Sequence, residues 1–233
     1  MLARLASDGA ALRDAATDLD MAVPTCPGWT VRDAVEHTAV VYAHKSTILE
    51  GGLDAPPRPW PPEFGYDDVR DFFDEQLHRV IEALRTRDPA TSVWTWYPPE
   101  QNVGFWVRRM MQETVIHRAD VESASGWPSK VDAAVAIDGI DELLICMLDE
   151  ETEAPGSGER IAIAAGDAGW TVTLGADVIT VTQGAGDADA RLEGEPSDLL
   201  LALWNRLPYD AVRPSGDPAA LATLRRAVAA TTQ

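Results

Sequence analysis

The chain has 233 residues, 45% of them hydrophobic, which is enough to fill the core of one large domain or two modest ones. Its 38 acidic and 19 basic residues give a formal net charge of −19, which repels nucleic acids and anionic membrane surfaces. We therefore expect neither of these as a partner.

The sequence predicts a cytoplasmic protein. The N-terminal segment lacks the continuous apolar core of a signal peptide, and no apolar run approaches the roughly 18 residues that a membrane helix needs. Two cysteines, Cys26 and Cys146, are too few for a disulfide framework and fit a reducing compartment.

Four amphipathic helices are predicted in the first half of the chain. Thr30, followed three residues later by Asp33, resembles a capping box that starts the second helix. The Pro- and Gly-rich residues 50–66 cannot be helical and form a long connection to the third helix. The predicted helices cover residues 2–19, a stretch from about 31, residues 67–85, and a stretch from about 103.

The composition changes near residue 128, which indicates a domain boundary. A helix is predicted over residues 132–150, followed by a polar gap and by the alternating runs RIAIAA, GWTVTL and DVITVTQ. This alternation is typical of an antiparallel meander, and ADARLEG adds a short strand. The remaining predicted helices cover residues 196–206 and 217–229.

The predicted fold class is therefore α+β, in two domains. Residues 1–128 form an antiparallel four-helix bundle, and residues 129–233 form a small α+β domain with an antiparallel sheet.

Glu113 and His117 lie one turn apart on the side of the fourth helix that we expect to be buried. A buried carboxylate costs several kcal/mol unless it has a partner, and His117 is the nearest candidate. The spacing suits a shared metal ion, and it suits a structural hydrogen bond equally well. The fourth helix alone leaves both interpretations open.

His37 on the second helix has apolar neighbours on its own face. A lone histidine in that setting is more often a core residue than a ligand, but here a second helix offers matching ligands. His37, Glu113 and His117 together give two imidazoles and one carboxylate. Three protein ligands with an open fourth position are typical of catalytic zinc sites, whereas structural sites are usually closed by four.

Several neighbouring residues are expected to support this set or to lie outside it. Asp120 either orients the His117 ring or acts as a distant fourth ligand, and Arg109 pairs with a carboxylate. His44 is expected to support the site or to face solvent, and His78 to face solvent. Cys26 is interpreted as an unreactive loop thiol.

The residues around these candidates resemble a known family. The segments CPGWTVRDAVEHTA and QETVIHRADVE are similar to the mycothiol-dependent maleylpyruvate isomerase family, whose N-terminal domain is a DinB-like four-helix bundle. The segment ADARLEGEPSDLLLALWNR is similar to the smaller C-terminal domain of that family. The resemblance implies a divalent metal, generally zinc, bound by His37, Glu113 and His117.

The resemblance also implies the chemistry. The open metal position takes the thiol of mycothiol, the low-molecular-weight thiol of actinobacteria, and zinc presents it as a thiolate. The thiolate adds to a small electrophilic substrate, for isomerisation of a cis double bond or for S-transfer. An arginine of the C-terminal domain holds substrate carboxylates; the candidates are Arg206, interpreted as catalytic, and Arg213.

Two alternatives remain open. The first alternative to an enzyme is a metal- or thiol-binding module without turnover, such as a sensor or carrier. The second is a structural helical protein. In the structural case Glu113 and His117 simply pair with each other.

Overall fold

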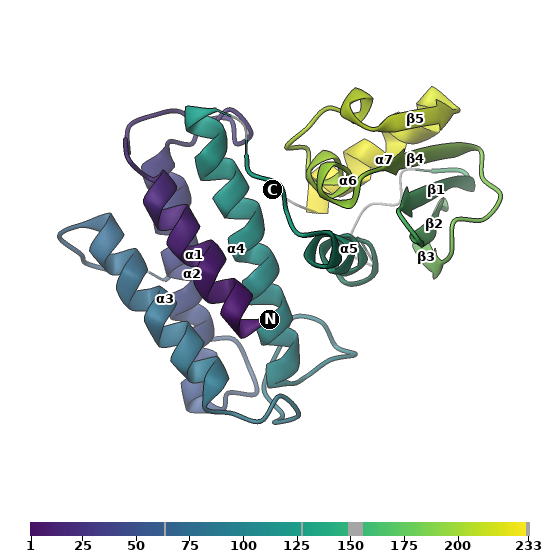
Figure 1. The fold of residues 1–233 in the computed structure, drawn as a ribbon. Helices are drawn as coiled ribbons and strands as arrows, with labels where there is room; N and C mark the ends of the chain where they lie inside the picture. Colours follow the sequence, from purple (N-terminus) through teal and green to yellow (C-terminus); the bar gives the residue numbers. More distant parts are fainter. Residues whose placement is uncertain (63, 127, 149–155, 232–233) are drawn as a thin grey trace. The chain divides into compact units, whose positions relative to one another are not determined.

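A computed structural model describes residues 1–62, 64–126, 128–148 and 156–231. The chain divides into two compact units, Met1–Ser129 and Lys130–Gln233. The first consists of helices and the second contains a sheet, as Figure 1 shows. The predicted α+β fold class is confirmed.

The first unit contains the four predicted helices. Helix α2 packs against α3 and α4, and α1 packs against the same two helices, so α1 and α2 lie at opposite corners of the bundle. The connection between α1 and α2 is long because these helices follow one another in the chain without being neighbours. The helices are α1 (Leu2–Ala15), α2 (Val31–Gly51), α3 (Val69–Arg85) and α4 (Val103–Ser125).

The start of α2 is fixed by the capping box that the sequence predicts. The backbone N–H of Thr30 donates to Oδ2 of Asp33 at 2.7 Å, and the backbone N–H of Asp33 donates to the Thr30 hydroxyl at 3.4 Å. These bonds satisfy amides that have no partner within the helix. The helix is capped at its C-terminal end by Gly52, whose φ of 56° is a left-handed conformation that glycine adopts without steric cost.

A buried ion pair joins α1 to α4. The Arg118 guanidinium donates to Oδ1 of Asp8 at 2.6 Å, and the side chains of both residues are almost fully buried. Burial raises the pKa of Asp8, against the opposing effect of Arg118, so the carboxylate depends on its partner for compensation.

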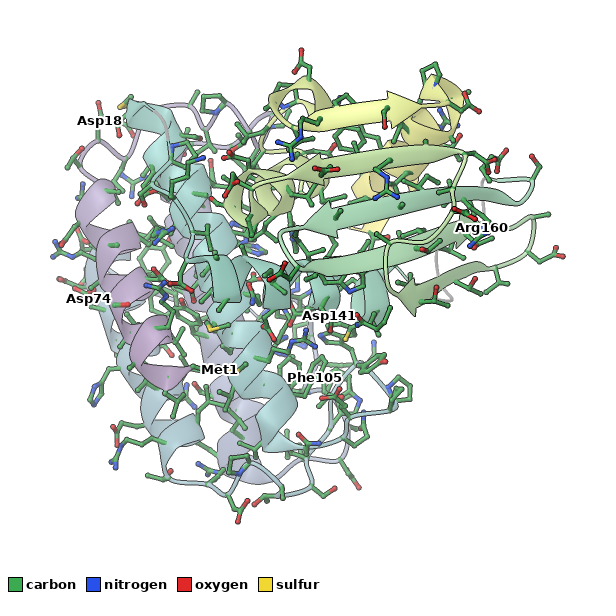
Figure 2. The ribbon with its side chains drawn as sticks, turned by 45° about the vertical axis from the view of Figure 1, so that its right-hand side comes forward. Met1, Asp18, Asp74, Phe105, Asp141 and Arg160 are labelled. Atoms are coloured by element: carbon green, nitrogen blue, oxygen red, sulfur yellow. The ribbon has the colours of Figure 1, made fainter. Side chains whose placement is uncertain are left out.

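The second unit begins with helix α5 (Ala133–Asp141), which continues as a short π-helix, Glu142–Met147. The sequence predicts one helix over residues 132–150 here; its last two residues and part of the polar gap after it lie outside the described residues. Oδ1 of Asp141 accepts hydrogen bonds from the Trp170 indole at 2.9 Å and from the Gln183 amide at 2.7 Å. Asp141 therefore ties α5 to the sheet (Figure 2).

The sheet has five strands in the order β3-β2-β1-β4-β5. The predicted antiparallel meander of β1, β2 and β3 is present, but β4 pairs in parallel with β1, so the sheet is mixed. Alternation of residue types identifies a strand without indicating its partner or direction. The strands are β1 (Glu159–Ala165), β2 (Ala168–Leu174), β3 (Ile179–Gln183), β4 (Ala190–Gly194) and β5 (Arg213–Gly216).

Helices complete the second unit. Helix α6 packs on α5, and α7 packs on β1 and β4. The bounds are α6 (Pro196–Leu203), a 3-10 turn (Tyr209–Ala211) and α7 (Pro218–Thr231). Within the described ranges, no helix has both the length and the apolarity required to cross a membrane.

We predict that Arg118→Met destabilises the protein by about 3–5 kcal/mol, because it removes the buried partner of the Asp8 carboxylate and leaves only the more exposed Arg4, 3.6 Å away. Chemical denaturation monitored by circular dichroism measures this change. The double variant Asp8→Asn/Arg118→Met is the control and should recover part of the loss, since no buried charge remains. Equal stability of Arg118→Met and the wild type would contradict the prediction.

Candidate metal centre

Three side chains from two helices converge on one point. Nε2 of His37 on α2 lies 3.3 Å from Oε1 of Glu113 on α4, and Nε2 of His117 lies 3.3 Å from the same oxygen. One ligand atom from each residue lies within 4.8 Å of the other two. The structure therefore brings together all three candidate ligands that the sequence indicates.

Local structure accounts for this convergence. Glu113 and His117 are four residues apart on α4, so both project from the same face of the helix. The Thr30 cap fixes where α2 starts, and His37 follows two turns later, on a helix that packs against α4. The bundle thus sets the backbone on both sides of the site.

The spacing of the donor atoms fits a metal ion. In a tetrahedral site with bonds of roughly 2.0–2.1 Å to nitrogen and oxygen, neighbouring ligand atoms lie roughly 3.3–3.4 Å apart. The distances from Oε1 of Glu113 to the two imidazole nitrogens are both 3.3 Å. Two histidines and one carboxylate also form a donor set that zinc commonly uses.

The other oxygen of Glu113 is held by Arg109. The Arg109 guanidinium donates to Oε2 of Glu113 at 2.5 Å, which confirms the predicted pairing of Arg109 with a carboxylate. Burial favours the neutral form of Glu113, but Arg109 and both histidines outweigh it and hold its pKa well below the usual range. Glu113 is therefore a carboxylate that presents one oxygen to the site.

His117 is oriented from behind by a hydrogen-bonded chain. Its Nδ1 lies 3.0 Å from Oδ2 of Asp120, and the Thr25 hydroxyl donates to Oδ1 of Asp120 at 2.7 Å. The carboxylate accepts the Nδ1 proton, which leaves the lone pair of Nε2 directed at the site. Of the two predicted roles for Asp120, this geometry matches the one that orients the ring.

Trp29 covers the two imidazoles. Its ring stacks on His117 with 6.1 Å between centroids and lies 5.1 Å from His37. Sequence reasoning did not single out Trp29, although it lies within the segment CPGWT that precedes the second helix. The side chain of His37 is 37% exposed, whereas that of His117 is only 10% exposed. The site is therefore open to solvent on the His37 side.

His117 lies between two carboxylates. It faces Asp120 through Nδ1 and Glu113 through Nε2, so its protonated form donates a hydrogen bond to each of them. Burial lowers the pKa of His117, but these two carboxylates raise it to about 9 overall. The two carboxylates therefore favour positive charge at this position.

The other candidate residues have separate environments. His44 is buried rather than solvent-facing, because Pro57 and Trp60 of the connection after α2 lie against it, and the sequence did not indicate that contact. His78 is exposed, as predicted. Cys26 is half-buried and Cys146 is buried.

Three aromatic residues precede α4, where they could either line a pocket or close one end of the bundle. Trp94 packs on Trp106, while Trp96 and Tyr97 pack on Phe105. The Trp106 indole also donates to the Trp94 carbonyl at 2.8 Å. These contacts cover the first turn of α4, which matches closure of the bundle end.

The two arginines proposed for substrate binding belong to the second unit. The Arg206 guanidinium donates to the Trp204 carbonyl at 2.8 Å and stacks on the Trp204 ring. Arg213 is exposed and pairs with Glu193 at 2.7 Å. A role for Arg206 at the reaction centre stays a prediction.

Together, the bundle and its two-histidine, one-carboxylate cluster define a helical protein with a candidate metal centre, joined to a small α+β unit. Comparison with family models assigns both parts. Residues 2–122 match the mycothiol maleylpyruvate isomerase N-terminal domain, and residues 134–223 match the C-terminal domain of the same family. The chain therefore belongs to the mycothiol maleylpyruvate isomerase family, which confirms the resemblance seen in the sequence.

Solved structures show the same fold. A crystal structure of mycothiol-dependent maleylpyruvate isomerase matches with a TM-score of 0.65 and 14% identity, over 93% of this chain and 92% of that one. A histidine-to-alanine mutant of that isomerase matches with a TM-score of 0.64 and 13% identity, over the same shares of the two chains. No curated protein sequence matches the chain significantly.

Proposed function

We propose that this protein is a metal-dependent isomerase that uses mycothiol as a thiol cofactor. The convergence of His37, Glu113 and His117 on one point is the observation that carries the proposal. Zinc is the metal that best suits this donor set, and three ligands leave a fourth position for an exchangeable group. Family membership over both units supports the choice of thiol and of reaction.

A bound zinc ion supplies a positive charge that lowers the pKa of a thiol at its open position, so that the thiol reacts as thiolate near neutral pH. The surrounding protein residues position the three candidate ligands and shield them from solvent on one side. Arg109 keeps Glu113 charged and restricts it to one donor oxygen. Asp120 fixes the His117 ring, and Trp29 covers both imidazoles on one side.

The thiol chemistry needs no nucleophile from the protein. The mycothiol sulfur forms a bond to one carbon of the substrate double bond, the remaining single bond rotates, and elimination of the thiol restores the double bond in the trans form. Mycothiol is regenerated in each turnover, so it acts as a cofactor. In S-transfer the sulfur–carbon bond persists, and one mycothiol is consumed for each substrate molecule.

The experiment that tests this function mixes the zinc-loaded protein with mycothiol and maleylpyruvate and follows the substrate spectroscopically. We expect conversion that depends on mycothiol, with many turnovers per thiol, and loss of conversion after zinc is removed by chelation. Consumption of one thiol per substrate would indicate S-transfer. Zinc binding without any turnover of electrophiles would indicate a metal- or thiol-binding module.

We predict that His117→Ala lowers zinc affinity by at least roughly 100-fold, more than the loss of a supporting residue costs, while the bundle stays folded. A zinc competition titration and circular dichroism measure the two effects. His78→Ala is the matched control, because His78 is exposed. An unchanged zinc content in His117→Ala would contradict the ligand assignment.

We also predict that Arg206→Met raises KM for a carboxylate substrate about tenfold, as expected for the loss of one charge-assisted hydrogen bond, and leaves zinc content unchanged. Steady-state kinetics test this. Arg226→Met serves as the control, since Arg226 is an exposed arginine of the same unit to which no role is assigned. Equal KM values for Arg206→Met and the wild type would exclude this role.

A further inference from the structure

Lys45 on α2 is a buried cation that the proposed mechanism does not use. The chain contains only two lysines, Lys45 and Lys130. The Lys130 side chain is 71% exposed, whereas Lys45 is only 8% exposed. Burying an ammonium group is costly unless an anion compensates it, so the partners of Lys45 decide what this residue does.

The described contacts of Lys45 contain no anion. Its Nζ lies 3.0 Å from Nδ1 of His44, and 4.5 Å and 5.1 Å from the ring centroids of Trp60 and Trp106. Within the described part of the chain, no carboxylate forms an ion pair with Lys45. Two aromatic faces and one imidazole thus hold the ammonium group.

His44 acts here as a neutral acceptor. Burial and the charge of Lys45 lower the pKa of His44 to about 4, so the ring carries a single proton at neutral pH. Nε2 of His44 lies 3.4 Å from the Pro57 carbonyl, which can only accept. The proton therefore resides on Nε2, and Nδ1 accepts a hydrogen bond from the Lys45 ammonium.

The nearby charges do not neutralise Lys45. Burial lowers its pKa to about 8, Glu113 opposes that shift, and Arg109 adds to it. Glu113 is already paired with Arg109 at 2.5 Å. Lys45 is therefore a local excess of positive charge in a protein whose formal net charge is −19.

Lys45 lies between the same two helices as the candidate metal centre. Trp106, which contacts Lys45, precedes Glu113 by seven residues on α4, and Lys45 follows His37 by eight residues on α2. Eight residues of helix span about 12 Å. A small organic acid together with the lysine side chain can cover much of that length.

We propose that Lys45, held by His44, Trp60 and Trp106, binds a carboxylate of the substrate and so makes this protein specific for small organic anions. This inference rests on the proposed function, which identifies the reaction that the bound anion undergoes. The binding step itself needs no turnover. The incoming carboxylate supplies the counter-ion that no described residue provides to Lys45, and the aromatic faces hold the ammonium in place before the anion arrives.

The experiment titrates maleate, a simple dicarboxylate, into the zinc-loaded protein by calorimetry. The variants are Lys45→Met, which keeps the length and removes the charge, and Lys45→Arg, which keeps the charge. Lys130→Met is the matched control. We expect Lys45→Met to weaken maleate binding at least tenfold, Lys45→Arg to stay within about threefold, and Lys130→Met to match the wild type.

The same variants give different results if Lys45 has only a structural role. If Lys45 serves stability alone, Lys45→Met lowers the melting temperature and binds maleate as the wild type does, and the proposal is overturned. If Lys45 serves binding, the melting temperature is unchanged or higher, because a buried charge has been removed. Failure of Lys45→Met to fold, or no maleate binding by the wild type, would also overturn the proposal.

The result of the maleate titration can be distinguished from the result of the test of the proposed function. Absence of mycothiol-dependent turnover would leave the maleate titration of Lys45→Met and wild type interpretable as a comparison of charge. Conversely, unchanged maleate binding in Lys45→Met would leave the metal site and the thiol chemistry intact. Neutral maleamide, which should bind none of the variants, shows whether charge drives the interaction.

Discussion

The buried carboxylate of Glu113 is the group on which the candidate site depends. One oxygen is held by Arg109 and the other faces two imidazoles, so the side chain has no rotational freedom left. Arg109 and the two histidines keep its pKa low despite burial, so Glu113 presents a carboxylate oxygen to the site. Orientation, charge and the choice of ligand all follow from this one side chain.

Much of this arrangement could be predicted from the sequence because it is local. Helical spacing places Glu113 beside His117 and Arg109, and Asp120 one turn further on, so the contacts within α4 need no knowledge of the fold. The start of α2 was equally accessible, because a capping box is a short-range motif. Only the approach of His37 on α2 to Glu113 and His117 on α4 depends on how the helices of the bundle pack.

The features that were missed depend on contacts between distant segments. His44 is buried because Pro57 and Trp60 lie against it, and nothing in the helical pattern indicates where that connection runs. Lys45 did carry a signal, since a lysine within the apolar stretch VVYAHKSTIL is unusual. Strand β5 is exposed at every position and has no apolar alternation, and the parallel pairing of β4 is a property of the assembled sheet.

The order of the elements along the chain bears on how the protein matures. All three candidate ligands precede residue 118, and α4 ends at Ser125, whereas the sheet of the second unit is completed only by β5 near the C-terminus. Domains generally fold as units during synthesis, N-terminal first. The unit that carries the candidate metal site can therefore assemble on the ribosome while the remaining residues are still being translated.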